Sequence, residues 1–149
     1  MIQRVQTIYL LLAILAVAAF QFAPVIRYEA PDIQYVRNMA AWDVSRFISG
    51  YFVFVVPILD GIAAGFSLIA IFLFKKRSIQ SLLCWVAIAF HLAAVAHIAY
   101  FFQTTSTPID IIYTLWNLAA IPPVVFWLLA HFAIQKDEAL VKSMDRLRD

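Results

Sequence analysis

Four long blocks of apolar residues constrain this chain more than any other feature of its sequence. They cover about residues 7–25, 51–74, 81–103 and 109–134. A helix needs about 20 mostly apolar residues to cross roughly 30 Å of hydrocarbon. Backbone polar groups in lipid must also be paired within the structure, and an apolar block of this length does so as a helix. The pattern predicts an all-α membrane protein, a bundle of four transmembrane helices.

The composition supports lipid as the solvent of these blocks. Of 149 residues, 64% are hydrophobic and only 13% are charged, against about 25% charged residues in soluble globular proteins. A helix that is hydrophobic all round must be buried in lipid or in a large core, and this chain is too short for a large core. We therefore expect one domain, residues 1–149, with the lipid bilayer as a partner. The net charge of +2 is too small to indicate a nucleic-acid partner.

The distribution of Lys and Arg predicts the orientation of the spans. Connections on the cytoplasmic side of a membrane are enriched in basic residues. The side with more Lys and Arg residues is therefore predicted to be cytoplasmic. This orientation puts both termini in the cytoplasm and the 27–50 loop outside. That loop, which mixes charged and aromatic residues, is either an interfacial segment or a docking loop for a partner. The basic residues of the predicted inner side are Arg4, Lys75, Lys76, Arg77, Lys136, Lys142, Arg146 and Arg148, against Arg27, Arg37 and Arg46 outside.

The tail over residues 135–149 is predicted to continue the last helix. Leu140, Met144 and Leu147 fall at helical spacing and form one apolar stripe among charged residues. An amphipathic tail of this kind would lie on lipid headgroups or pack against a partner protein.

Polar residues within the predicted spans are the candidate functional site. An ionisable group in the bilayer is costly and is by default a functional hypothesis. Counting 1.5 Å per residue puts Asp60, His91, His97 and Asn117 at similar depths, in one polar layer. Because His91 and His97 are about 120° apart around their helix, at most one should meet Asp60. The layer would be a proton relay or a structural network that joins helices.

Two further patterns concern helix geometry. Gly61 and Gly65 form a GxxxG motif, which predicts close packing against another helix, within the bundle or in another subunit. Pro57, Pro122 and Pro123 fall inside predicted spans and predict kinks, because proline removes a backbone donor.

The sequence contains no motif that indicates catalysis. It has no phosphate-binding glycine loop, no HExxH, no GxSxG and no CxxC. The single cysteine, Cys84, excludes an internal disulfide and a cysteine zinc site. We expect no catalytic residues, no metal and no cofactor.

The two ends of the chain carry a resemblance. Residues 1–13 read MIQRVQTIYLLLA, and residues 136–148 read KDEALVKSMDRLR. They resemble a family of small four-span membrane proteins of Bacteroidota that is described as a domain of unknown function. The resemblance implies a bacterial inner-membrane location and no assigned activity. It marks as family features four residues that would form a docking face in the cytoplasm: Arg4, Asp145, Arg146 and Arg148.

Three functions fit these observations. The leading hypothesis is a non-enzymatic accessory or scaffold subunit of a larger inner-membrane protein complex, with other membrane proteins as partners. The first alternative is a small proton- or ion-coupled transporter or channel centred on Asp60. The second alternative is a lipid- or quinone-binding subunit of a membrane enzyme that uses Trp85, His91 and Trp116.

Overall fold

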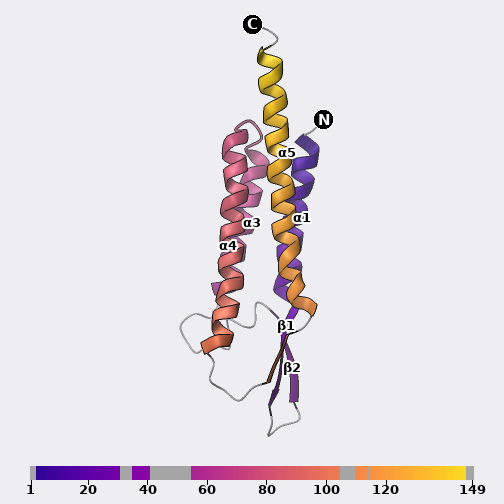
Figure 1. The fold of residues 1–149 in the computed structure, drawn as a ribbon, viewed down its shortest axis with the longest axis vertical. Helices are drawn as coiled ribbons and strands as arrows, with labels where there is room; N and C mark the ends of the chain where they lie inside the picture. The colour runs from indigo at the N-terminus through magenta and orange to yellow at the C-terminus, as the bar shows by residue number, and fades with distance from the viewer. Residues whose placement is uncertain (1–2, 31–34, 41–54, 105–109, 114, 147–149) are drawn as a thin grey trace.

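A computed structural model describes residues 3–30, 35–40, 55–104, 110–113 and 115–146. Four long helices run side by side in it (Figure 1). Within the described residues, these four are long and apolar enough to cross a membrane, so the predicted four-helix architecture is confirmed. The helices are α1 (Gln3–Phe22), α3 (Val55–Phe72), α4 (Arg77–Thr104) and α5 (Ile121–Arg146), the last preceded by a 3-10 helix, η1 (Leu115–Ala120).

The bundle buries several alanines between its helices and exposes many large apolar side chains on its outer surface. α1 and α4 each pack against both α3 and α5. Alanines such as Ala63, Ala87 and Ala130 are fully buried between the helices, where their small size lets the backbones approach. Large apolar residues such as Leu15 and Phe72 instead lie 65% and 78% exposed. Outward-facing apolar side chains on long helices are the pattern of a multi-pass membrane protein.

A small antiparallel sheet, which the sequence analysis did not predict, lies at one end of the bundle (Figure 1). It contains β1 (Pro24–Ala30), β2 (Tyr35–Ala40) and β3 (Asp110–Tyr113) in the order β2-β1-β3. Arg27 on the central strand is opposite Asn38 and Ile112. β1 and β2 thus occupy the first part of the predicted interfacial loop, while residues 31–34 and 41–50 of that loop lie outside the described residues.

The sheet changes where the last helix begins. β3 lies where the fourth span was expected to start, and α5 begins only at Ile121. Pro122 and Pro123 are therefore in the first turn of α5, and Pro57 is in the first turn of α3. The backbone N–H groups of a first helical turn have no partner within the helix, so proline is tolerated there. The predicted mid-span kinks at these prolines are wrong.

The opposite end of the bundle carries the turn between α3 and α4 and the two chain ends. We call it the terminal end; it is bounded by Gln3, the 73–76 turn and Arg146. α5 extends beyond the other helices there (Figure 1), so the prediction that the last helix continues into the tail is confirmed as far as Arg146.

Candidate functional site

The inner face of α3 carries one charged residue. Its buried positions are Val56, Asp60, Ala63, Ser67 and Ala70, which recur every three or four residues and so form one stripe of the helix. Asp60 is only 1% exposed. Because an isolated carboxylate is costly away from water, its partners decide what this site can do.

His91 of α4 is the main partner of Asp60. Its Nδ1 atom lies 2.7 Å from Asp60 Oδ1, and the His91 side chain is fully buried. On the other edge of the ring, His91 Nε2 lies 3.1 Å from the carbonyl oxygen of Ala120, in η1. Gln21 of α1 donates a hydrogen bond from Nε2 to Asp60 Oδ2. The network therefore ties together α1, α3, α4 and the segment that leads into α5.

The geometry fixes most of the protons in this network. The carbonyl oxygen of Ala120 can only accept, so His91 Nε2 must carry a hydrogen. One further proton then lies between His91 Nδ1 and Asp60 Oδ1. The pair is either an imidazolium with a carboxylate or a neutral imidazole with a carboxylic acid, and both forms have zero net charge. The pair holds one proton that can move between nitrogen and oxygen without changing the buried charge.

Aromatic rings surround this pair. The ring of His91 packs edge-on against Phe20, with centroids 5.3 Å apart, and against Trp127, at 5.6 Å. Both rings belong to fully or almost fully buried residues. The unsatisfied atom beside the pair is Gln21 Oε1, which is buried and has no hydrogen-bond partner among the described residues.

A second buried hydrogen bond lies next to the first network. The indole Nε1 of Trp127 donates to Ser67 Oγ at 2.7 Å, and Ser67 Oγ donates to the carbonyl oxygen of Ala63 at 3.0 Å. Trp127 thus contacts His91 through its ring and α3 through its N–H. Asp60, His91, Trp127 and Ser67 form a continuous seam between α3, α4 and α5.

The other two residues of the predicted polar layer do not join Asp60. His97 lies on a different side of α4 from His91, and its Nε2 is buried without a hydrogen-bond partner in the described part of the chain. Asn117 lies in η1, half-buried, and the carbonyl of Ala120 takes the position near His91 instead. The structure thus brings together Asp60 and His91 from that layer.

Four groups of these buried hydrogen-bond networks were not predicted from the sequence. Gln21 carried a usable signal, since it is a polar residue within a predicted span. Ser67 and Trp127 are ordinary residues in apolar helices and become informative only as a pair. The Ala120 carbonyl has no side-chain signal, because a backbone acceptor becomes free only where a helix ends or changes type.

The GxxxG motif makes no close helix contact within the described residues. A Cβ atom added at Gly61 or Gly65 would meet no atom within 4 Å, and the buried face of α3 is the one that carries Asp60. Within the described residues, no other helix packs closely against these glycines, so the helix–helix seam stays a prediction. The two glycines face outward, which leaves contact with another subunit as the open alternative.

The remaining predicted positions lie towards the terminal end. Arg4 is in the first turn of α1, and Asp145 and Arg146 are in the last turn of α5. Their side chains, and all of Arg148, lie outside the described residues. Near this end, Trp85 packs against His131 rather than His91, with ring centroids 5.3 Å apart. His131 Nδ1 lies 2.8 Å from Ser81 Oγ.

The described part of the chain contains no cluster of metal-binding side chains, and its cysteine is buried. No group of three or more His, Cys, Asp or Glu residues there could hold a metal ion. Cys84 is a buried free thiol that donates to the carbonyl oxygen of Gln80 at 3.5 Å. It serves as an ordinary packing residue of α4.

Four long apolar helices around a buried polar pair indicate a multi-pass helical membrane protein. The chain belongs to the family described as Domain of unknown function (DUF4293), which it matches over residues 2–147. The resemblance to a family of unknown function is thereby confirmed; the Bacteroidota origin and the terminal motifs stay predictions. Comparison with curated proteins and with solved structures gives no match.

Proposed function

We propose that the protein is a non-enzymatic accessory or scaffold subunit of a larger protein complex in the bacterial inner membrane, with both termini in the cytoplasm. The observation that carries the proposal is the extension of α5 past the bundle. Leu140 and Met144 lie there four residues apart, on one face, and are 42% and 62% exposed. No element of the described chain covers this apolar stripe.

An uncovered apolar stripe on a projecting helix is a typical docking element. Amphipathic helices bind partners by placing such stripes in a groove, with anchors at i and i+4. The polar flank of the extension carries the ion pair between Lys142 and Glu138, four residues apart. The extension therefore has both the apolar anchors and the charged border that a protein interface needs.

The charge distribution supports the orientation in this proposal. Basic residues of the described chain gather at the terminal end: Lys75, Lys76 and Arg77 in and after the α3–α4 turn, and Lys136 and Lys142 on α5. Because cytoplasmic connections carry the excess of Lys and Arg, this end is proposed to face the cytoplasm.

Site-specific crosslinking in intact membranes tests the proposal. A photoreactive residue at Leu140 or Met144 should crosslink the chain to a defined protein partner. The same residue at Leu15, an equally exposed position on α1 within a predicted span, serves as the matched control and should give lipid adducts.

A paired variant tests whether the stripe holds the complex together. Leu140→Asp with Met144→Asp should release the chain from its partner on native gels, without changing its own thermal unfolding. A wild-type chain that runs as a lone monomer after gentle extraction, with no crosslinked partner, would refute the scaffold function.

A second candidate, proton-coupled transport, is favoured by the proton held between Asp60 and His91. Asp60→Asn separates the two functions well. An asparagine can donate from Nδ2 to His91 Nδ1 and accept from Gln21 at Oδ1, so it preserves the hydrogen bonds but not the mobile proton. If the site transports protons, flux in reconstituted vesicles should be lost while thermal stability is kept. Unchanged flux, or no flux in the wild type, would exclude transport through this pair.

A further inference from the structure

The apolar stripe of α5 continues the face of that helix that packs against α1. α1 packs along α5, and Gln6 Nε2 donates a hydrogen bond to the carbonyl oxygen of Ala133 at 3.3 Å. Leu140 and Met144 follow Ala133 by seven and eleven residues. At 100° per residue, both lie within about 20° of Ala133 around the helix axis. The two exposed side chains are therefore in line with α1.

α1 begins before the stripe is reached. Its first described residue, Gln3, is three residues before Gln6, whereas Leu140 is seven residues beyond Ala133. At 1.5 Å per residue, Leu140 lies roughly 6 Å past Gln3 along the bundle, and Met144 roughly 12 Å past it. Figure 1 shows this part of α5 projecting beyond the start of α1. We call the space beside the stripe, in line with α1, the docking space.

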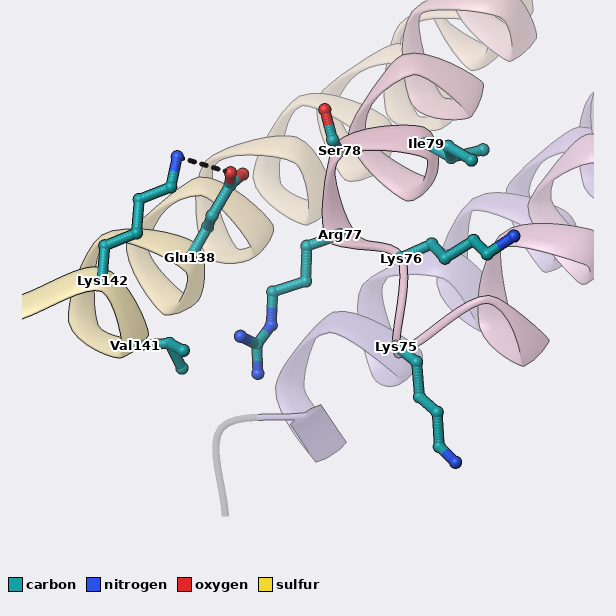
Figure 2. Close-up of a pocket in the computed structure, with 8 residues that line it drawn as sticks. All are labelled: Lys75, Lys76, Arg77, Ser78, Ile79, Glu138, Val141 and Lys142. Atoms are coloured by element: carbon teal, nitrogen blue, oxygen red, sulfur yellow. Dashed lines mark ion pairs between the residues drawn. The ribbon is translucent and has the colours of Figure 1, made fainter. Parts of the chain in front are cut away.

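The side of α5 that faces α4 offers a less suitable surface. A groove lies there between α5 and the α3–α4 turn (Figure 2), and Val141 contributes a half-buried apolar side chain to it. Arg77 Nε lies 2.8 Å from Asp137 Oδ2, and Lys142 Nζ lies 2.8 Å from Glu138 Oε1. Figure 2 shows the Arg77 side chain directed towards α5. The groove is therefore bordered by charges that are already paired.

The border of the docking space is positively charged. Lys136 is exposed and is four residues before Leu140, so the two are neighbours on the helix surface. Lys136 has no ion pair among the described residues. The first turn of α1, where the docking space begins, contains Arg4 and no acidic residue. A partner that fits this space presents apolar side chains to the stripe and acidic groups to Lys136.

We propose that the partner of this scaffold subunit binds through an acidic amphipathic helix, which lies end to end with α1 and packs against Leu140 and Met144. The proposal rests on the scaffold function and specifies the partner element and its position. A helix fits because α1 packs as a helix on the same face, and residues three and four apart form the same ridges along all of it. A second copy of this chain would bring another unpaired Lys136 to the border, which like charges disfavour.

Photocrosslinking in intact membranes from two further positions tests the docking space. A photoreactive residue at Gln3 should crosslink the same partner as one at Leu140, because both positions border this space. Ile79 is the matched control: it is 43% exposed and lines the groove on the α4 side, so it should not crosslink that partner.

The possible crosslinks separate the two proposals. A partner that is reached from Leu140 but not from Gln3, or as strongly from Ile79 as from Gln3, would overturn the docking space and leave the scaffold function intact. A crosslink between two copies of this chain would assign the docking space to self-association and also overturn it. No protein partner from Leu140 at all would instead refute the scaffold function.

Two lysine variants test the acidic character of the partner. Lys136→Gln should weaken the complex roughly fivefold, the upper range for one exposed ion pair, and the difference should shrink at high salt. Lys142→Gln is the matched control, since Lys142 is exposed on the same helix but pairs with Glu138; it should stay within about twofold of the wild type. Titration on native gels measures both. An equal loss in the two variants, or no loss in Lys136→Gln, would contradict an acidic partner. Thermal unfolding of both variants should match the wild type.

Discussion

Two acid–base pairs of nearly the same length lie in opposite surroundings in this molecule. Asp60 and His91 are 2.7 Å apart, and their side chains are 1% and 0% exposed. Glu138 and Lys142 are 2.8 Å apart, and their side chains are 31% and 72% exposed. Water screens the second pair, whereas the first has only protein partners around it. Because the two distances are nearly equal, we expect burial to set the difference in how much each pair contributes to stability.

Removing one member of each pair should give the largest difference. Asp60→Leu leaves His91 Nδ1 and Gln21 Nε2 without a hydrogen-bond partner in the bundle, and we expect it to lower the free energy of unfolding by about 3 kcal/mol. Glu138→Gln should lower it by less than about 0.5 kcal/mol, as is typical of exposed pairs four residues apart on a helix. Reversible unfolding in mixed detergent micelles measures both.

The conservative variant shows whether the interior effect comes from hydrogen bonding. Asp60→Asn, which can satisfy both neighbours, should lose less than about 1 kcal/mol. Equal losses in Asp60→Leu and Glu138→Gln would show that the interior pair is no more important for the fold than the exposed one.

A buried and an exposed serine allow the same comparison of stability losses, with a smaller expected difference. Ser67→Ala leaves the indole N–H of Trp127 buried without its acceptor, which should cost about 1–2 kcal/mol. Ser143 also donates a hydrogen bond, to the carbonyl oxygen of Leu140 at 2.8 Å, but it is exposed. Ser143→Ala should change stability by less than about 0.5 kcal/mol. The same micelle titration measures the two variants, and a larger loss at Ser143 would contradict the assignment of Trp127 as the acceptor-dependent residue.

The smallest expected effect concerns the outer face of α3. Gly61→Ala and Gly65→Ala should each raise stability by about 0.5 kcal/mol, because glycine is less favourable than alanine in a helix and the added Cβ meets no atom. The oligomeric state of the two variants in nanodiscs is the second measurement. Loss of an oligomer would place the glycines against another subunit, whereas a loss of stability in a monomer would mean that they pack within the chain.

The candidate site shows where sequence reasoning reaches its limit. Depth along each helix placed Asp60 and His91 in one layer, and the 120° offset showed that His91 and His97 could not both meet Asp60. Which of the two histidines meets Asp60 depends on the rotation of α4 about its axis relative to α3. Local sequence patterns do not determine this rotation. Asn117 failed as a partner because the chain near it forms β3 and η1 instead of a continuous helix.

The sequence by itself determined the four helices and their solvent. Their apolar length admits no other structure in lipid, since each backbone group must find its partner within its own segment. Only the tertiary structure decided the sheet, because β1 finds its partners partly in β3, a segment far along the chain. It also decided which histidine meets Asp60, which carbonyl accepts the hydrogen bond from His91 Nε2 and which face of α3 is left open. These depend on helix rotation and on the end of a helix, where packing between distant segments outweighs local preference.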